Sequence, residues 1–422
     1  MARFANLDAI TAALKQRNFA WYFAGSSIGL IGIWGQRLTI SWLAWEFTKS
    51  GFWLGIVVAA DLLPTIFFTP IAGVVADRVN RHRMMFVTQF LGMLQALALA
   101  ALAFAGLLNI WWLIGLTLFI GIVWAFNTAA RLSMVPNLME REHVPSAVAM
   151  DSAIFNLARF IGPMVAGYLI AAFGAGPTFL INGITFAIFL ACLLQARMIR
   201  DERGAKSSAN IFVQATEGMR YAAKHPGIRP VLILVIALAI GIKPTLELLA
   251  GVTDTVYNLG PTGLGNLMAA SAVGATIAAI WLAQRGTVVG MTRIVIGALV
   301  LGIVSLFAFT ATQSFVFGLV CAAFIGAAIV VGGTGTQTLM QNAVDGAMRG
   351  RVMSLYGMVY RGGPALGAFA MGSAAEFIGF QSALACGAII GAGALVWVFR
   401  QRKIMVSALE GDPDKGQGPH GT

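Results

Sequence analysis

The chain has 422 residues, of which 58% are hydrophobic and only 11% are charged, and its mean hydropathy is +0.81. This composition excludes a soluble globular protein, because soluble domains carry about 25% charged residues. The 28 Lys and Arg residues outnumber the 17 Asp and Glu residues, and the resulting net charge of +11 would by itself also fit a nucleic-acid-binding protein.

Apolar segments of transmembrane length follow one another along almost the whole chain. A helix of about 20 apolar residues crosses the hydrocarbon core of a bilayer, and twelve such segments occur in the sequence. They lie at 18–46, 52–76, 84–106, 110–130, 147–173 and 177–197 in the first half and at 229–257, 262–283, 294–312, 314–340, 350–378 and 380–400 in the second. The sequence therefore predicts an all-α integral membrane protein of twelve transmembrane helices in two six-helix bundles.

The basic residues orient these segments. If the N-terminus lies inside, nearly all of the 28 Lys and Arg residues fall in loops on the cytoplasmic side, and Lys49 falls in an outer loop. This asymmetry is the positive-inside pattern, and it predicts that both termini lie in the cytoplasm. Because the basic excess marks topology, we expect the partners to be a lipid bilayer and a small molecule, with no nucleic acid.

The polar segments divide the chain into domains. A basic N-terminal segment with apolar residues at helical spacing predicts an interfacial helix, and the first span is too long for the apolar region of a cleavable signal. A tail rich in Gly, Pro, Asp, Lys and Gln predicts disorder. The expected domains are a cytoplasmic segment 1–17, a bundle 18–197, a cytoplasmic linker 198–228, a bundle 229–400 and a disordered cytoplasmic tail 401–422.

The two halves resemble each other around their fifth spans. In each half, a basic loop leads through a serine to an arginine within the span and then to a Gly-Pro pair. These residues are Ser152, Arg159, Gly162 and Pro163 in the first half and Ser354, Arg361, Gly363 and Pro364 in the second. Many secondary transporters consist of six-span repeats with the substrate site between them. We therefore expect the Gly-Pro pairs to interrupt regular helix packing near such a site.

The loop between the second and third spans carries the most specific motif, G-V-V-A-D-R-V-N-R-H-R at 73–83. A carboxylate at the membrane boundary meets the positive end of a neighbouring helix, and the arginines that follow it can bridge to carboxylates or carbonyls. A glycine here permits close helix approach. Such contacts hold one arrangement of the two halves and break in the other. The motif predicts a conformational latch made of Gly73, Asp77, Arg78, Arg81 and Arg83, and the alternative is an ordinary basic anchor.

This loop matches the G-x-x-x-D-R-x-x-R-R type of the major facilitator superfamily, which the chain resembles over roughly residues 15–400. Within it, the chain resembles the twelve-span bacterial exporters that include siderophore (enterobactin-type) and macrolide efflux proteins. The segments T-K-S-G-F-W-L-G, Leu63-Pro64 and E-G-M-R-Y-A-A-K-H-P match that branch too. The resemblance implies efflux by a proton antiporter in the bacterial inner membrane. Unlike drug antiporters of this kind, however, the fourth span has no charge before Arg131 at its cytoplasmic end.

Ionisable residues within the spans point to the mechanism, because charges inside a bilayer are costly and mark a pathway or a pairing. Arg37 and Asp61 lie about 13 Å below the same outer edge on neighbouring spans, so they are placed to pair. Lys243 and Glu247 share one face of the seventh span. The full set is Arg37, Asp61, Arg159, Lys243, Glu247 and Arg361.

These charges predict how transport is driven and what is carried. Asp61 or Glu247 is expected to bind and release a proton as access alternates, and static buried pairs are the alternative. Four cations against two acids favour a substrate with an acidic or phenolate group. Trp34, Trp42, Phe67 and Trp124 would add stacking surface, although aromatic side chains of this kind also serve in packing.

The sequence lacks the motifs that other classes of protein require. The sequence has no ATP-binding G-x-x-x-x-G-K-[ST] loop and no G-x-S-x-G elbow, so we expect no enzyme and no cofactor. Cys192, Cys321 and Cys386 have neither disulfide nor metal-ligand spacing, so no metal site is expected. We therefore expect a monomeric, proton-coupled exporter of an amphipathic small molecule. The alternatives are an importer or lipid flippase of the same fold and a non-transporting membrane sensor.

Overall fold

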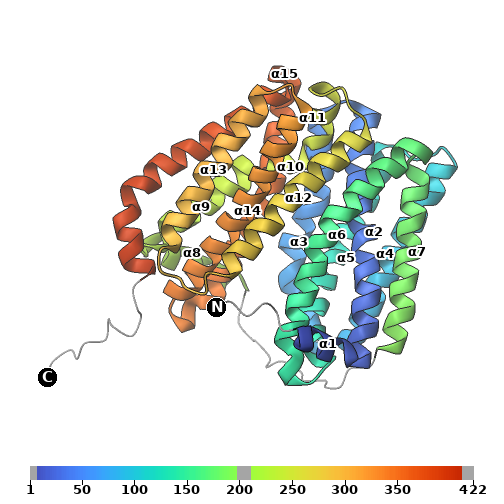
Figure 1. The fold of residues 1–422 in the computed structure, drawn as a ribbon, viewed down its shortest axis with the longest axis horizontal. Coiled ribbons are helices and arrows are strands. Elements are labelled where there is room, and N and C mark those ends of the chain that lie inside the picture. Colours follow the sequence, from blue (N-terminus) through green and yellow to red (C-terminus); the bar gives the residue numbers. More distant parts are fainter. Residues whose placement is uncertain (1–6, 197–210, 411–422) are drawn as a thin grey trace. The chain divides into compact units, whose positions relative to one another are not determined.

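The structure is a computed structural model that describes residues 7–196 and 211–410. Within these ranges the chain is helical and contains no β-strand. The chain divides into two compact units (Figure 1). The first holds residues up to 207 together with Leu248–Ala272, and the second holds Ser208–Glu247 together with the residues from 273 onward.

Among the described residues, the first unit contains seven α-helices from the first half of the sequence. They are α1 (Leu7–Lys15), α2 (Arg17–Thr48), α3 (Gly51–Arg78), α4 (Arg81–Phe104), α5 (Ile110–Met134), α6 (Val144–Phe173) and α7 (Ala175–Gln195). Two short 3₁₀ turns, η1 (Val135–Asn137) and η2 (Arg141–His143), join α5 to α6. The unit also includes α11 (Leu249–Thr255) and the first part of α12 (Pro261–Ala283).

The second unit begins with an amphipathic helix and continues with a broken span. Its elements are α8 (Ile211–Lys224), α9 (Ile228–Ala237), the π-helix η3 (Leu238–Ile242), α10 (Pro244–Glu247), the rest of α12, α13 (Met291–Ala311), α14 (Phe315–Ala343) and α15 (Gly346–Leu409). Figure 1 shows the two arms of α15, in orange and red, meeting at a turn. Gly379 makes this turn with a φ of 77°, a conformation that costs glycine little.

The membrane spans agree with the sequence prediction. Ten of the described helices are long and apolar enough to cross a membrane by length and composition. The last of them, Met348–Leu409, covers the two predicted spans 350–378 and 380–400. The helix α2 covers the first predicted span, 18–46, although it is not among these ten. The prediction of an all-α membrane fold is therefore confirmed.

Helix starts follow ordinary capping chemistry. Side-chain oxygens of Ser50, Asn80, Asn109 and Ser314 accept hydrogen bonds from backbone N–H groups in the first turns of α3, α4, α5 and α14. These N–H groups have no partner within their own helices, so each cap satisfies a donor that would otherwise be unpaired. Asn80 belongs to the predicted latch motif, and its local role is to begin α4.

Helix packing repeats between the two units. In the first, α2 packs against α6 and α7, and α4 packs against α5 and α7. In the second, α15 takes the places of both α6 and α7, because it packs against α9 and η3, as α6 and α7 pack against α2, and against α13, as α7 packs against α4. The pair α13 and α14 corresponds to α4 and α5. The same pattern of helix packing in both units is what the predicted pseudo-symmetry of the two six-helix bundles requires.

A buried chain of amides joins three helices of the first unit. Asn182 Nδ2 donates to Gln36 Oε1 at 2.7 Å, and Gln36 Nε2 donates to Gln95 Oε1 at 2.8 Å. All three side chains are buried. Hydrogen bonds of this kind hold transmembrane helices together, because hydrophobic forces do not act between helices in lipid.

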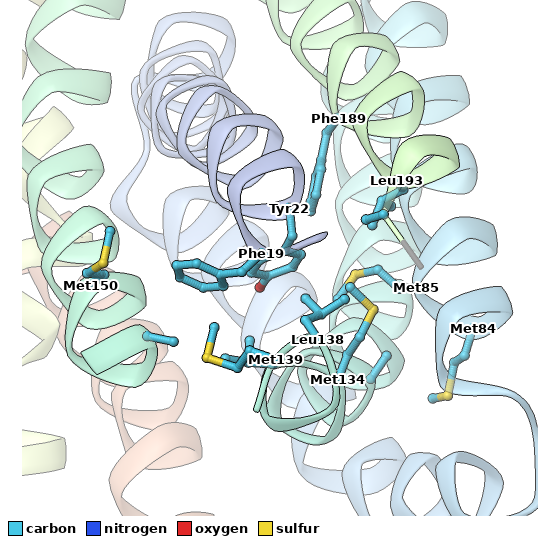
Figure 2. Packing of buried hydrophobic residues seen from close by; sticks show 14 of the residues in the cluster. Phe19, Tyr22, Met84, Met85, Met134, Leu138, Met139, Met150, Phe189 and Leu193 are labelled. Carbon is cyan, nitrogen blue, oxygen red and sulfur yellow. The ribbon is translucent and has the colours of Figure 1, made fainter. Parts of the chain in front are cut away.

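An apolar cluster fills one end of the first unit (Figure 2). Phe19 and Tyr22 of α2 are fully buried there and lie beside Met85, Leu138 and Phe189. The rings of Tyr22 and Phe189 meet edge to face, with their centroids 5.9 Å apart. This cluster fixes the position of Tyr22, whose hydroxyl is used by the polar group described below.

The structure corrects one sequence prediction. The tail was expected to be disordered from residue 401, but α15 continues to Leu409, and Met405 and Leu409 are buried. Residues 411–422 and the linker residues 197–210 lie outside the described part. The helices α6 and α15 continue through Pro163 and Pro364. Membrane helices tolerate proline where neighbouring groups satisfy the freed backbone.

Candidate functional site

Arg37 and Asp61 form an ion pair between α2 and α3. Arg37 Nε donates to Asp61 Oδ2 at 3.0 Å, and Nη2 donates to the same oxygen. The side chains are 31% and 19% exposed, so water reaches the pair only in part. The two residues stand at the same predicted depth on successive spans, which explains why the chain brings them together.

A cation–aromatic stack extends from this pair into α6. The guanidinium carbon of Arg37 lies 5.2 Å from the ring centre of Trp34, and that of Arg159 lies 5.4 Å from the same centre. The ring of Phe155 meets Trp34 edge to face at 5.7 Å. Two guanidinium groups thus flank one half-buried indole, an arrangement that attracts both aromatic surface and negative charge.

A second charged group lies deeper in the same unit, and the sequence analysis missed it. Arg131 Nη2 donates to Asp151 Oδ1 at 2.8 Å, and its Nε donates to Oδ2 at 3.1 Å. Tyr22 donates its hydroxyl to Asp151 Oδ1 at 3.4 Å. The sequence placed Arg131 at a cytoplasmic helix end, but its side chain is only 14% exposed. The available signal was Asp151, which stands inside the next predicted span.

A small cavity lies beside this group. Tyr22, Ser26, Gln89, Asn127 and Arg131 contribute its polar lining. Its volume is about 10 Å³, which is close to the space that one water molecule occupies. The buried Oε1 of Gln89 has no hydrogen-bond partner among the described residues, and a water in this cavity would supply one.

The second unit has its own cation–aromatic contact. Lys243 Nζ lies 3.8 Å from the ring centre of Tyr360 and donates to the Tyr360 carbonyl oxygen at 2.7 Å. The ring of Tyr360 stacks on that of Tyr356, with centroids 5.5 Å apart and planes 10° apart. Lys243 follows the π-helix η3 and leads into α10. The sequence analysis named Lys243 but neither tyrosine.

Lys243 and Glu247, which share one face of the predicted seventh span, do not pair with each other. Lys243 turns to Tyr360, and Glu247 makes no hydrogen bond or ion pair with any described residue. Glu247 is half-buried at the last position of α10. Arg361 is exposed on α15 and likewise makes no hydrogen bond or ion pair within the described part of the chain.

The Gly-Pro residues lie where helices approach closely. A Cβ added to Gly162 would stand 2.6 Å from the carbonyl oxygen of Ile31 on α2, and one added to Gly363 would stand 2.7 Å from Ala239 Cβ on η3. Gly333 of α14 lies against Tyr360, and Tyr356 donates its hydroxyl to the Gly333 carbonyl oxygen at 2.7 Å. Each contact fixes an element that carries one of the cations or rings described above.

The residues of the predicted latch lie at the junction of α3 and α4. Arg78 and Arg83 are exposed, and Arg81 is half-buried. The structure shows no close helix approach at Gly73, because a Cβ added there would meet no atom within 4 Å. The side chain of Asp77 lies outside the described part. His82 anchors the junction, because its Nε2 lies 2.8 Å from the carbonyl oxygen of Leu193 on α7.

Among the aromatic residues predicted to offer stacking surface, Trp34 lies between the two arginine contacts described above, and Trp42 has Lys49 Nζ 6.0 Å from its ring centre. Trp42 is buried, Trp124 lines the small cavity, and Phe67 is 69% exposed. Cys192 and Cys321 are buried and Cys386 is exposed, all as free thiols. No three His, Cys, Asp or Glu side chains of the described ranges gather closely enough to hold a metal ion.

The sequence profile of the transmembrane secretion effector family matches residues 9–414. The chain belongs to this family. Among the relatives of this chain, the Staphyloferrin A transporter of Staphylococcus aureus is 26% identical over 85% of this chain and 90% of that protein. Macrolide efflux protein A of Streptococcus pyogenes is 23% identical over 81% of this chain and 85% of that protein.

The same fold occurs in solved transporter structures. The crystal structure of the nucleoside transporter NupG superposes with a TM-score of 0.72 at 12% identity, over 91% of this chain and 99% of the NupG chain. The resemblance to the major facilitator superfamily is thereby confirmed. The chain is a multi-pass membrane transporter of that superfamily, and its relatives are transporters rather than enzymes.

Proposed function

We propose that the chain exports an amphipathic small molecule with an acidic or phenolate group, by alternating access driven by the proton gradient. One observation carries the proposal. In each half a cation lies against an aromatic ring on corresponding spans: Arg159 of the fifth span against Trp34 of the first, and Lys243 of the seventh against Tyr360 of the eleventh.

Such contacts suit an anionic, partly aromatic cargo. A ring face held beside a cation offers stacking to an aromatic group and attraction to its negative charge, and both effects strengthen where water is scarce. The predicted intramembrane charges comprise four cations and two acids, so an anion would reduce the imbalance. Charges in such segments are costly and rarely lack a function.

Export is supported by the family and its members. The family is described as a secretion effector, and the relatives include a siderophore transporter and a macrolide efflux protein. Siderophores of the catecholate and hydroxycarboxylate classes carry the acidic or phenolate groups that the cation–ring contacts favour. We accordingly place the protein in a bacterial inner membrane, as a monomer with both termini in the cytoplasm.

Glu247 is the better of the two candidate proton carriers. Asp61 is bound by Arg37, and Glu247 has no ion pair among the described residues. Replacing Glu247 by Gln should abolish proton-driven transport and leave exchange of substrate down its own gradient. If both Glu247→Gln and Asp61→Asn retain proton-driven transport, the carboxylate mechanism is wrong.

The junction of α3 and α4 would act as a conformational latch in this scheme. Gly73, Asp77 and Arg78 belong to the end of α3, and Arg81 and Arg83 belong to the start of α4. Replacing Arg83 by Gln should change the balance between inward- and outward-facing states without changing substrate selectivity. A change in selectivity with an unaltered balance would instead assign these residues to the substrate pathway.

Everted membrane vesicles test the function directly. With an imposed proton gradient, a catecholate or hydroxycarboxylate siderophore should accumulate inside the vesicles, and a neutral analogue of the same size should accumulate less. Arg159→Gln and Lys243→Gln should each raise the KM for the anionic compound at least about tenfold, since losing a charged contact of this kind removes about 1.5–3 kcal/mol. Arg293→Gln is the matched control, because Arg293 is exposed. Equal transport of charged and neutral compounds by all four proteins would refute the proposed substrate class.

A further inference from the structure

Two basic residues without an acidic partner stand at one end of the second unit. Arg229 lies in the first turn of α9, and Arg400 lies in the second arm of α15, at the ends of the predicted spans 229–257 and 380–400. Both residues are exposed, and neither side chain forms a hydrogen bond or an ion pair with a described residue. Neither α9 nor the arm of α15 that follows Gly379 contains an Asp or Glu. These helices therefore leave the positive charge at their ends unbalanced.

A tryptophan lies beside both of these cations. The guanidinium carbon of Arg229 lies 5.6 Å from the ring centre of Trp397. Arg400 follows Trp397 by three residues, which is about 60° round the helix, so the two side chains share one face of α15. Trp397 is half-buried, and its indole N–H has no hydrogen-bond acceptor among the described residues. Because tryptophan prefers the headgroup level of a bilayer, three free donor groups are placed together at that level.

An apolar surface continues from these donors along both helices. On α9, Leu232 and Ile236 follow Arg229 at helical spacing, and Ile236 is 42% exposed. On α15, Ile390 is 54% exposed two turns before the tryptophan, and a Cβ added to Gly393, one turn before it, would meet nothing within 4 Å. Acyl chains gain from covering such a surface, whereas a soluble anion does not. The donors and the apolar surface together match the two parts of a lipid.

We propose that the ends of α9 and α15 at this boundary form a binding site for one anionic phospholipid. Its phosphodiester accepts hydrogen bonds from Arg229, Arg400 and the indole of Trp397, and its acyl chains cover the apolar surface. Guanidinium groups suit the geometry of phosphate oxygens, and basic sites between membrane helices bind lipid headgroups in this way. A zwitterionic lipid carries the same phosphate, but its own ammonium group competes with the arginines, so the site selects anionic headgroups. The site takes a membrane component rather than the cargo, and therefore goes beyond the proposed function.

Native mass spectrometry of the purified full chain counts the bound lipid and needs no transport assay. Phosphatidylglycerol should bind more tightly than phosphatidylcholine with the same acyl chains. Arg229→Gln and Arg400→Gln should each weaken phosphatidylglycerol binding about fivefold, the factor that one basic residue at a membrane surface contributes. Arg402→Gln is the matched control, because it removes the same charge from the same helix end. Arg402 lies about 140° round the helix from Trp397, with its guanidinium carbon 4.1 Å from the ring centre of Phe399.

Thermal unfolding separates lipid binding from a packing role of the Arg229 contact. Phosphatidylglycerol should raise the Tm of the wild-type protein and of Arg402→Gln, and this rise should shrink in Arg229→Gln and be largely kept in Arg229→Lys. Loss of packing on Trp397 alone would instead lower the Tm equally with and without the lipid. Arg400→Gln guards against a misfolded Arg229 variant, because Arg400 makes no ring contact with a described residue.

Three results would overturn the lipid site. The first is an equal loss of affinity in Arg402→Gln and in the Arg229 and Arg400 variants, which would indicate attraction to the overall charge. The second is equal binding of phosphatidylcholine and phosphatidylglycerol. The third is displacement of phosphatidylglycerol by excess glycerol 3-phosphate, which would assign the site to a soluble phosphate.

Discussion

Gly162 controls both the packing of α6 on α2 and the position of the cation–aromatic stack. A Cβ at this position would lie 2.6 Å from the carbonyl oxygen of Ile31, 2.8 Å from Trp34 Cβ and 3.0 Å from the Gly35 nitrogen. Two of these three atoms belong to the backbone, which cannot move as a side-chain tip can. Gly162→Ala should therefore push the two helices apart.

The size of the effect follows from these distances. Ordinary contact begins at about 3.4 Å, so the closest pair must separate by about 0.8 Å. Overpacking of this kind costs about 1–3 kcal/mol, and it outweighs the preference of helices for Ala over Gly of about 1 kcal/mol. Arg159 lies one turn before Gly162 on α6, so the same separation moves its guanidinium away from Trp34. We expect both lower stability and weaker binding of an anionic substrate.

Thermal unfolding followed by tryptophan fluorescence measures the stability. The chain has ten tryptophans, and the net loss of up to about 2 kcal/mol that remains after the gain in helix propensity corresponds to a fall in Tm of up to roughly 8 °C. Gly115→Ala is the matched control, since Gly115 lies inside α5 and a Cβ there would meet nothing within 4 Å. The packing argument is refuted if the two variants have the same Tm, or if Gly162→Ala loses stability while keeping the wild-type KM for the anionic substrate.

Three further variants test other contacts. Asp151→Asn leaves the Arg131 guanidinium buried without its carboxylate, so Tm should fall by several degrees in thermal unfolding. Breaking such a pair costs about 3–5 kcal/mol when it is fully buried. Replacing both residues by apolar ones should recover much of the lost stability. Glu410→Gln weakens the bonds from the Gly290 and Thr292 nitrogens to the carboxylate, so the last turn of α15 should exchange its amide hydrogens faster. Burial lowers the pKa of His225 against the opposing attraction of Asp345. The contribution of the neutral imidazole to stability is therefore present above about pH 6.5 and is lost as the pH falls below that value. Between pH 7.5 and 5.5, the Tm of the wild-type protein should fall more than that of His225→Asn, whose side-chain oxygen can replace the accepting Nδ1.

The helical spans were predictable from the sequence because hydropathy and the positive-inside pattern act on long segments. Single contacts were predictable only where the partners are close in sequence. Arg37 and Asp61 lie on successive spans at equal depth, which is enough to bring them together. Lys243 and Tyr360 are 117 residues apart, and nothing in either local sequence selects the other. Glu247 shares a helix face with Lys243, yet Lys243 contacts Tyr360 of another helix and does not pair with Glu247.

Helix ends were the other source of error. Arg131 counted as a loop cation because it closes an apolar segment, but the structure buries it against Asp151. The tail beyond residue 400 has a polar composition, but Leu409 packs into the bundle and Asn342 donates to its carbonyl oxygen at 2.9 Å. Hydropathy averages over a window, so one or two buried residues at a boundary leave no signal in it.

The sequence repeat and the structural repeat pair different residues. Aligning the Gly-Pro segments matches Arg159 with Arg361, which predicts one arginine in the same role in each half. Arg361 is exposed, and the cation that lies on a ring in the second half is Lys243 of the seventh span. The first half takes its ring from the first span and its cation from the fifth, and the second half reverses this order. Two helix pairs related by the repeat can therefore both have a cation–aromatic contact although the cation and the ring lie on opposite members of the pair. The halves should accordingly be compared by their contacts rather than residue by residue.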